Sequence, residues 1–286
     1  MKRTTSSSRQ QKIAAVYDTD IWPLVPERAA EMILRALPRR PATVVFEAGC
    51  ATGGLSLAVA ERLDDASRIL AVDGSPALID LAEKEKSRHA SGAKVSFDVG
   101  DSIPPLPVED GSCDLVLSNL AVIDAADPPA LVSELARCLK PGGRLLLTIP
   151  LRGCWTEFLD LYAEVLTEHG KRDALLALET YKASLPDAEG AARWLERAGL
   201  ENVTVQTTRF ELLFKSAREF FFAPVIELGP LAVWKQIVGG RGDEMQDVFF
   251  FVKEAIETYF SGTVFPVTMV IGCLQGEKPG TGAGPT

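Results

Sequence analysis

A glycine-rich turn near residue 50 constrains the fold of this chain more than any other feature. The apolar run Val44–Phe46 leads into Glu47, and the turn Gly49–Gly53 follows. Apolar residues then recur at helical spacing, at Leu55, Ala58, Val59 and Leu63. The pattern predicts a β-strand, a tight turn and the N-terminus of a helix. Glycines let a backbone approach a bound group closely, and a helix start offers unpaired N–H groups. An ordinary strand-to-helix turn without a ligand is the alternative interpretation.

Three later strands are predicted to end in polar residues. The strand over 68–72 ends at Asp73, Asp101 follows the strand over 94–99, and Asn119 follows the strand over 114–117. In an open parallel sheet these strand ends lie along one edge, where ligands bind. An acid at the tip of the strand after a glycine turn is well placed to accept hydrogen bonds from two ribose hydroxyls. The sequence therefore predicts a nucleoside-binding crevice at this edge.

Five short blocks, in this order, resemble those of class I S-adenosylmethionine-dependent methyltransferases. They are Glu47-x-Gly49-x-x-x-Gly53, Val72-Asp73, Gly100-Asp101-Ser102, Asp114–Asn119 and Leu139-Lys140-Pro141-Gly142-Gly143. The resemblance covers about residues 44 to 150. It departs from the family at Ala51, where a third glycine is usual. It implies an α/β fold, with a doubly wound, Rossmann-like sheet of seven strands in the order 3-2-1-4-5-7-6. The last strand would be antiparallel, and a helical cap would be added.

The resemblance also implies a cofactor, S-adenosyl-L-methionine, with S-adenosyl-L-homocysteine as the product. It implies that Glu47 orients the glycine turn and favours the ammonium group, that Asp73 holds the ribose, and that Asp101 meets the adenine amino group. Tyr17, Asn119 and Arg152 are candidates near the methyl acceptor, and no metal is expected. The full cofactor-binding set is Glu47, Gly49, Cys50, Ala51, Gly53, Asp73, Gly74, Ser75, Asp101, Ser102, Asn119 and Leu120.

Within the family, the chain is most similar to the small-molecule branch that resembles malonyl-acyl-carrier-protein O-methyltransferases. Tyr17-Asp18, Ser118–Ala121 and the segment 210–220 carry this similarity. Where that branch would want an arginine for the acceptor carboxylate, this chain has Phe158 and Leu159, with Arg152 nearby. We therefore expect methyl transfer to a small-molecule or acyl-carrier-bound acceptor, with O- or C-methylation favoured. The alternative is a non-catalytic cofactor-binding module that acts as an assembly or interaction factor. The alanine at position 51 counts against a nicotinamide-dependent dehydrogenase.

Charge and cysteine usage limit the remaining classes. The formal net charge is −9, which argues against a nucleic-acid partner because phosphate contacts need clustered Lys and Arg. The five cysteines form no CxxC pair, so we expect reduced core thiols in a cytoplasmic protein. No apolar run approaches the about 18 residues of a membrane span. The sequence leaves the oligomeric state open.

The domain organisation follows from composition and periodicity. We expect a disordered tail over 1–12, a lid helix within 13–40 that places Tyr17 at the pocket, and a methyltransferase domain over 41–275. A helical cap is expected as an insertion over about 216–260, where aromatic residues gather. Since aromatic side chains dominate protein cores, these mainly predict a cap core. The glycine-rich segment 276–286 is expected to be a second disordered tail.

Overall fold

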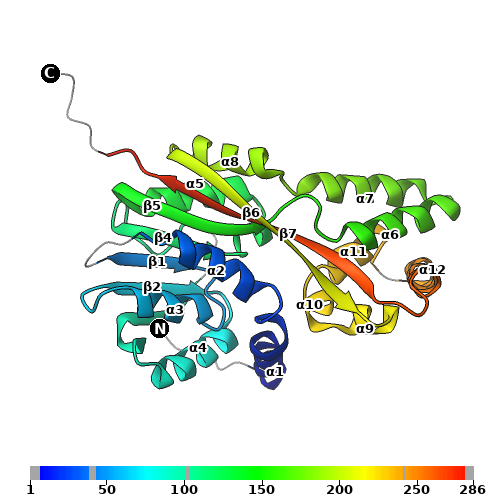
Figure 1. Cartoon of the computed structure of the whole chain (residues 1–286), viewed down its shortest axis with the longest axis horizontal. Coiled ribbons are helices and arrows are strands. Elements are labelled where there is room, and N and C mark those ends of the chain that lie inside the picture. Colours follow the sequence, from blue (N-terminus) through cyan, green and yellow to red (C-terminus); the bar gives the residue numbers. More distant parts are fainter. Residues whose placement is uncertain (1–6, 39–42, 101–103, 241, 281–286) are drawn as a thin grey trace. The chain divides into compact units, whose positions relative to one another are not determined.

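One mixed sheet organises the computed structural model, which describes residues 7–38, 43–100, 104–240 and 242–280. Within these ranges the sheet has seven strands in the order β3-β2-β1-β4-β5-β7-β6, as the sequence predicted. Figure 1 shows the strands and the helices that connect them. The strands are β1 (Val44–Ala48), β2 (Arg68–Asp73), β3 (Val95–Val99), β4 (Cys113–Asn119), β5 (Leu139–Pro150), β6 (Glu201–Phe214) and β7 (Phe265–Glu277).

The register of the parallel strands brings their carboxyl ends together. Strand β1 pairs in parallel with both β2 and β4, and Glu47 lies level with Ala71 and Leu117. Strand β2 pairs in parallel with β3, so that Asp73 lies level with Val99. The strands β1 and β4 are almost entirely buried, as expected for central parallel strands covered on both faces. The polar residues at the strand tips therefore share one edge of the sheet.

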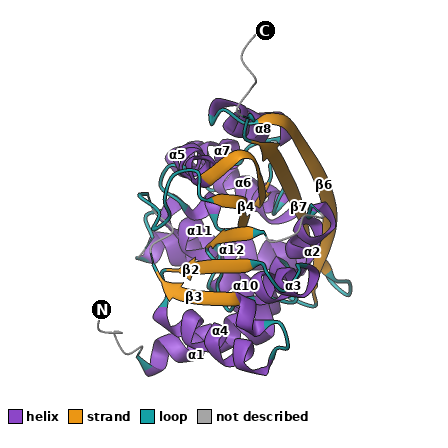
Figure 2. Ribbon diagram, turned by 90° about the vertical axis from the view of Figure 1, so that its left-hand side faces the viewer, coloured by secondary structure: helices purple, strands orange, loops and turns teal. Residues whose placement is uncertain are grey.

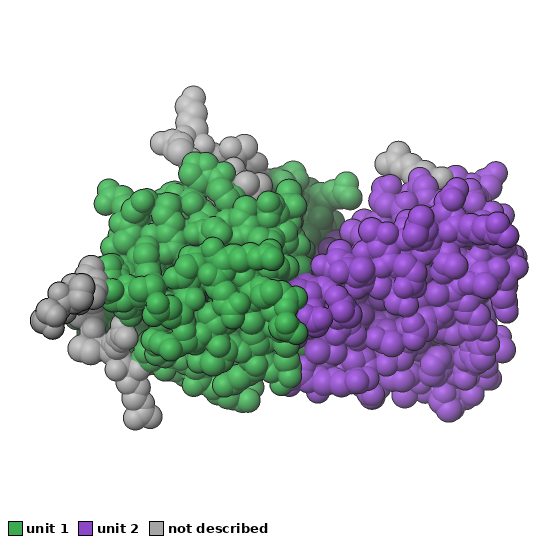
Figure 3. All heavy atoms as spheres, turned by 90° about the horizontal axis from the view of Figure 1, so that it is seen from above, with its two compact units in different colours: residues 1–149, 188–207, 271–286 green, residues 150–187, 208–270 purple. Residues whose placement is uncertain are grey.

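Two compact units divide the chain, and Figure 3 colours them separately. Unit 1 comprises residues 1–149, 188–207 and 271–286, and unit 2 comprises residues 150–187 and 208–270. In unit 1, helices cover both faces of the sheet, with α2 and α3 on one side and α5 on the other (Figure 2). The helical segments of unit 1 are α1 (Ser8–Val16), η1 (Tyr17–Ile21), α2 (Pro26–Ala36), α3 (Gly54–Arg62), α4 (Pro76–Arg88), η2 (Gly92–Lys94), η3 (Val122–Asp124), α5 (Pro128–Cys138) and α8 (Ala188–Arg197).

Unit 2 is built around aromatic side chains. The rings of Phe158 and Trp234 stack with centroids 4.2 Å apart, and the Tyr162 hydroxyl donates to the Trp234 carbonyl at 3.0 Å. Of its described helices, four lie within residues 216–260, where the insertion was expected, and the unit also takes in residues 150–187. Its helices are α6 (Thr156–Glu168), α7 (Arg172–Ser184), α9 (Ala217–Phe222), α10 (Pro224–Glu227), α11 (Leu231–Ile237) and α12 (Asp243–Tyr259).

Parts of both predicted tails belong to defined elements of the fold. Residues 8–12, expected in a tail, form the start of α1, because Ser7 and Gln10 make a reciprocal capping box. At the other end, β7 continues through Glu277, and the Lys278 ammonium donates to the carbonyls of Ala136, Arg137 and Leu139. Residues 1–6 and 281–286 lie outside the described residues.

Candidate functional site

The glycine turn after β1 is held from two sides. The N–H group of Gly49 donates to the Val72 carbonyl of β2 at 2.9 Å. Gly49 has a φ of +75°, and a Cβ built on it would lie only 2.3 Å from the Cβ of Ala121, which follows β4. Position 49 therefore requires glycine for two reasons, its left-handed backbone and the close approach of Ala121. Ala51 also adopts a positive φ of 48°, which is unusual for a residue with a side chain.

Asp73, at the tip of β2, holds the same turn through its carboxylate. One oxygen, Oδ2, accepts from the N–H group of Ala51 at 3.0 Å, and Oδ1 accepts from the N–H group of Ser75 at 2.9 Å. Burial raises the pKa of Asp73, while these two N–H groups oppose the rise. Each oxygen of a carboxylate has two lone-pair directions, so both can accept a second hydrogen bond from a ligand. The geometry thus agrees with the predicted proximity of Asp73 to the turn.

Glu47 lies beneath the turn and is almost completely buried, with 1% of its surface exposed. It accepts a hydrogen bond from the hydroxyl of Ser56, which is buried in the first turns of α3. Burial raises the pKa of Glu47 to about 7, against the effect of the Ser56 bond and with a further rise from the charge of Asp73. Ser56 is not among the predicted site residues, although a polar residue within the apolar start of α3 could have indicated its role.

The N-terminal segment lies against the glycine turn. Tyr17, in the short π-helical segment η1, has its phenol pKa raised far above the usual range by burial and by the nearby charges of Asp73 and Glu47. A Cβ on Gly54 would lie 2.4 Å from the indole ring of Trp22. Tyr17 and Trp22 thus cover the glycine turn and the acids beside it, although no local pattern in the sequence singles out Trp22.

Asn119 ends β4 with both ends of its amide engaged. Its Nδ2 donates to the Pro26 carbonyl at 3.0 Å, and its Oδ1 accepts from the Thr148 hydroxyl at 2.7 Å. Leu120 adopts a positive φ of 62°, and its N–H group donates to the Thr148 carbonyl at 3.0 Å. The segment 119–121 is therefore fixed next to Gly49, and Asn119, predicted near the transferred methyl group, is tied into the fold itself.

The other predicted site residues have mixed surroundings. Cys50 is buried beside Glu47 and Asp73, and burial raises the pKa of its thiol. Gly74 is exposed, and Ser75 caps the N-terminus of α4 with its hydroxyl. Arg152 belongs to unit 2, where it forms an ion pair with Asp187 at 3.3 Å. Asp101 and Ser102 lie outside the described residues.

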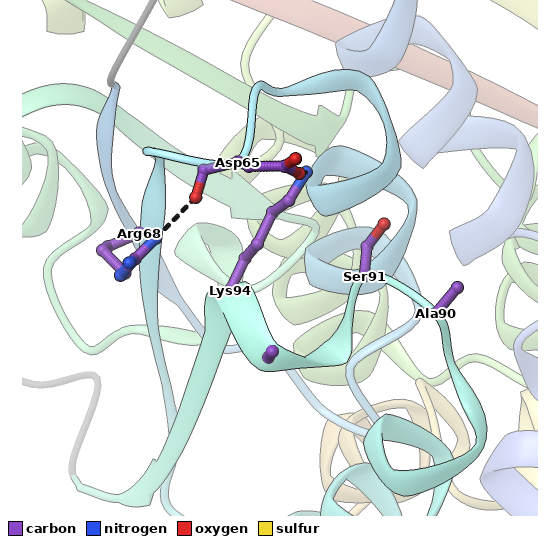
Figure 4. Close-up of a pocket in the computed structure, with 6 residues that line it drawn as sticks. Asp65, Arg68, Ala90, Ser91 and Lys94 are labelled. Carbon is purple, nitrogen blue, oxygen red and sulfur yellow. Dashed lines mark hydrogen bonds and ion pairs between the residues drawn. The ribbon is translucent and has the colours of Figure 1, made fainter.

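A pocket of about 250 Å³ lies at the opposite ends of β2 and β3 (Figure 4). Its cations already have partners within the fold. Arg68 donates to the carbonyls of Asp65 and Ser67. The ammonium of Lys94 donates to the carbonyls of Ala60 and Leu63 and pairs with the Asp65 carboxylate at 3.2 Å. We therefore assign this pocket a structural role, because its charges stabilise the end of α3.

No group of three or more His, Cys, Asp or Glu side chains is placed to hold a metal ion in the described part of the chain. Within the same ranges, no helix combines the length and the apolar character that crossing a bilayer requires.

Comparison with known sequences identifies the region around the glycine turn. Residues 46–147 match a family described as a methyltransferase domain. The chain is 30% identical over 135 residues to malonyl-[acyl-carrier protein] O-methyltransferase of Serratia marcescens, covering 47% of this chain and 49% of the relative. It is 27% identical over 195 residues to trans-aconitate 2-methyltransferase of Deinococcus radiodurans, covering 57% and 72%. For most of the first curated relatives that it matches, the chain spans between a third and two thirds of their length.

Solved structures share the fold at low sequence identity. The YcgJ protein of Bacillus subtilis superposes with a TM-score of 0.59 at 16% identity, covering 88% of this chain and 99% of that one. A putative methyltransferase of Bacillus halodurans gives a TM-score of 0.55 at 17% identity, with coverages of 87% and 98%. These likenesses extend the shared architecture beyond the region of the sequence match.

Proposed function

We propose that this chain, whose residues 46–147 match a methyltransferase domain, is a class I methyltransferase that binds S-adenosylmethionine and transfers a methyl group to a small-molecule or carrier-bound acceptor. One observation supports the proposal most: the Asp73 carboxylate is fixed against the glycine turn by the N–H groups of Ala51 and Ser75. This geometry supports the assignment of the ribose hydroxyls to Asp73, which the resemblance to the family implies.

The described residues fit such a cofactor. Asp73 retains capacity for two hydroxyls beside the turn, and Glu47 is a buried acid beneath that turn. We assign the methionine part to the turn Gly49–Gly53, the ribose to Asp73, and the orientation of the turn to Glu47. When bound, the cofactor supplies an electrophilic methyl group on a sulfonium centre. The protein's own contribution is alignment of the acceptor and exclusion of water.

An oxygen acceptor that is already anionic suits this chain best. The two histidines of the sequence are His89, which ends α4, and His169 of unit 2. His89 is separated from Asp73 by the length of α4, so it is not placed as a base at the strand tips. A carboxylate needs no base, because its oxygen attacks without losing a proton. Two relatives are named for acids, malonyl-[acyl-carrier protein] and trans-aconitate.

All five cysteines are buried and free, which supports the proposed cytoplasmic location.

Calorimetry with S-adenosylhomocysteine tests the cofactor assignment. We expect the wild-type chain to bind it and Asp73→Asn to bind it more weakly by about 1.5–3 kcal/mol, the scale of hydrogen bonds to a charged group. Asp98→Asn is the matched control, because Asp98 is an exposed acid one residue before the end of the neighbouring strand β3. Equal affinities of Asp73→Asn and the wild type would remove the assigned role. Binding of NAD in place of S-adenosylhomocysteine would overturn the proposal as a whole.

A turnover assay separates an enzyme from a non-catalytic module. The chain is incubated with S-adenosylmethionine and a panel of malonyl thioesters, tricarboxylates and neutral phenols, and methylated products are detected by mass spectrometry. We expect methyl esters of acids and no phenol ethers. Release of S-adenosylhomocysteine without any methylated acid would contradict the carboxylate assignment, and tight binding without turnover would favour the module.

A further inference from the structure

The described contacts give Asn119 a role that its position in the motif does not indicate. Its two polar groups face partners from two distant parts of unit 1. The Thr148 hydroxyl of β5 donates to its Oδ1 at 2.7 Å, and its Nδ2 donates at 3.0 Å to the carbonyl of Pro26, the first residue of α2. Asn119 thus links the central sheet to the N-terminal segment, across 93 residues of sequence.

The linked segment is the one that covers the glycine turn. Pro26 is buried, and the Glu27 N–H group just after it donates to the Trp22 carbonyl at 2.9 Å. The Trp22 N–H group donates in turn to the Tyr17 carbonyl at 2.8 Å. A continuous series of hydrogen bonds therefore runs from Thr148 through Asn119 to Pro26 and back along the chain to Tyr17. Apart from these bonds, the ring of Trp22 rests on Gly54.

The orientation of the Asn119 amide is fixed by Thr148. The Thr148 hydroxyl donates to Oδ1 of Asn119 and also accepts from the Leu120 N–H group at 3.1 Å. Because the hydroxyl proton is used on Oδ1, the amide must point its Nδ2 toward Pro26. Thr148 is fully buried, so this arrangement is shielded from competing water. Thr148, a residue of the sheet, thus sets the direction in which the Nδ2 group of Asn119 donates.

We propose that Asn119 is a positioning residue: with Thr148, it fastens the segment 17–26 over the glycine turn and so retains the cofactor. The identity of the retained ligand rests on the proposed function. The fastening of the segment 17–26 rests on the described contacts alone. It places the contribution of Asn119 in cofactor retention, and the methyl-transfer step itself does not need its amide.

Hydrogen exchange of the cofactor-free chain tests the fastening. In Asn119→Ala and in Thr148→Val, we expect the Trp22 and Glu27 amides to exchange at least about tenfold faster, the factor that corresponds to losing about 1.4 kcal/mol of local stability. Amides of β1 and β2 should be unchanged. Thr148→Ser, which keeps the hydroxyl, should restore wild-type protection. Ser118→Ala is the matched control, because its hydroxyl bonds to the Ala48 carbonyl within the sheet at 3.0 Å.

Binding of S-adenosylhomocysteine supplies the second readout. We expect a loss of affinity of up to about tenfold in Asn119→Ala and in Thr148→Val, set by the fraction of chains in which the segment 17–26 has opened, with kcat for a methylated acceptor little changed at saturating cofactor. If affinity falls in Asn119→Ala while Trp22 and Glu27 stay protected and Thr148→Val binds normally, Asn119 contacts the cofactor directly and the proposal is wrong. Unchanged exchange in both variants also overturns it. Faster exchange in a chain that binds no S-adenosylhomocysteine would leave the fastening intact and remove the proposed function.

Discussion

Replacing Glu47 by glutamine should change how the stability of the protein depends on pH. Glu47 is buried to 1% exposure and accepts from the Ser56 hydroxyl. Burial raises its pKa to about 7 from an ordinary value of 4.5. Between these values the folded chain keeps a proton that the unfolded chain has released. The free energy of unfolding therefore falls as the pH rises through this window.

The magnitude follows from the width of that window. A difference of about 2.5 pKa units at about 1.4 kcal/mol per unit corresponds to about 3 kcal/mol. This stabilisation is present below about pH 4.5 and is lost by about pH 7. Glutamine keeps an oxygen that can accept from Ser56 and has no proton to lose. Relative to the wild type, Glu47→Gln should thus gain about 3 kcal/mol on going from about pH 4.5 to about pH 8.

Urea unfolding at both pH values, followed by circular dichroism, measures this change. The other carboxyl groups titrate in both proteins, so their contributions cancel in the difference between Glu47→Gln and the wild type. Glu196→Gln, a change at an exposed residue of α8, serves as the control and should shift the difference by only a few tenths of a kcal/mol. A difference for Glu47→Gln that is the same at both pH values would refute the argument that burial keeps this acid protonated.

Two further substitutions test the packing around the site. Gly49→Ala should lower the free energy of unfolding by at least about 2 kcal/mol, because Gly49 has a φ of +75° and an added Cβ would overlap with Ala121. Adding Ala121→Gly should recover about half of this loss. A double-mutant cycle measured by urea unfolding tests the contact, and a cycle without coupling would contradict it. Lys94→Met should cost about 2–3 kcal/mol, because it removes the ammonium that bonds the carbonyls of Ala60 and Leu63. Thermal melting of Lys94→Met is compared with that of the exposed control Lys84→Met. Equal melting points of the two variants would argue against the assigned role of the pocket.

The part of the fold that sequence could predict is the part whose signals are local. The apolar strand before Glu47 and the glycines at 49 and 53 identify a strand, a turn and a helix without knowledge of distant residues. Strand-tip acids then follow from the rule that parallel strands end at one edge. The helix α1 was missed although its signal is local, because its serines and charges resemble those of a disordered tail and the capping pair Ser7 and Gln10 was overlooked.

The contacts that complete the site depend on residues far apart in the sequence. Asn119 was predicted near the cofactor, but its bonds to Pro26 and Thr148 arise only when α2 and β5 reach the tip of β4. The indole ring of Trp22 over Gly54 depends in the same way on the path of the N-terminal segment. In unit 2, composition alone could not separate the fully buried Phe220 from Phe222, which is 70% exposed. Periodicity within such short helices is too weak to make that distinction.

The left-handed backbone of Ala51 has a consequence for recognition. An alanine held at a φ of 48° stores about 1–2 kcal/mol of conformational energy, and the bond from its N–H group to Asp73 offsets that strain without any guest. The turn is therefore preorganised, and a nucleoside can bind without using part of its binding free energy to change the conformation of the turn. Affinity at such a site should come mainly from the contacts with the ligand. A glycine at position 51 would make the turn more flexible and the binding of the ligand weaker.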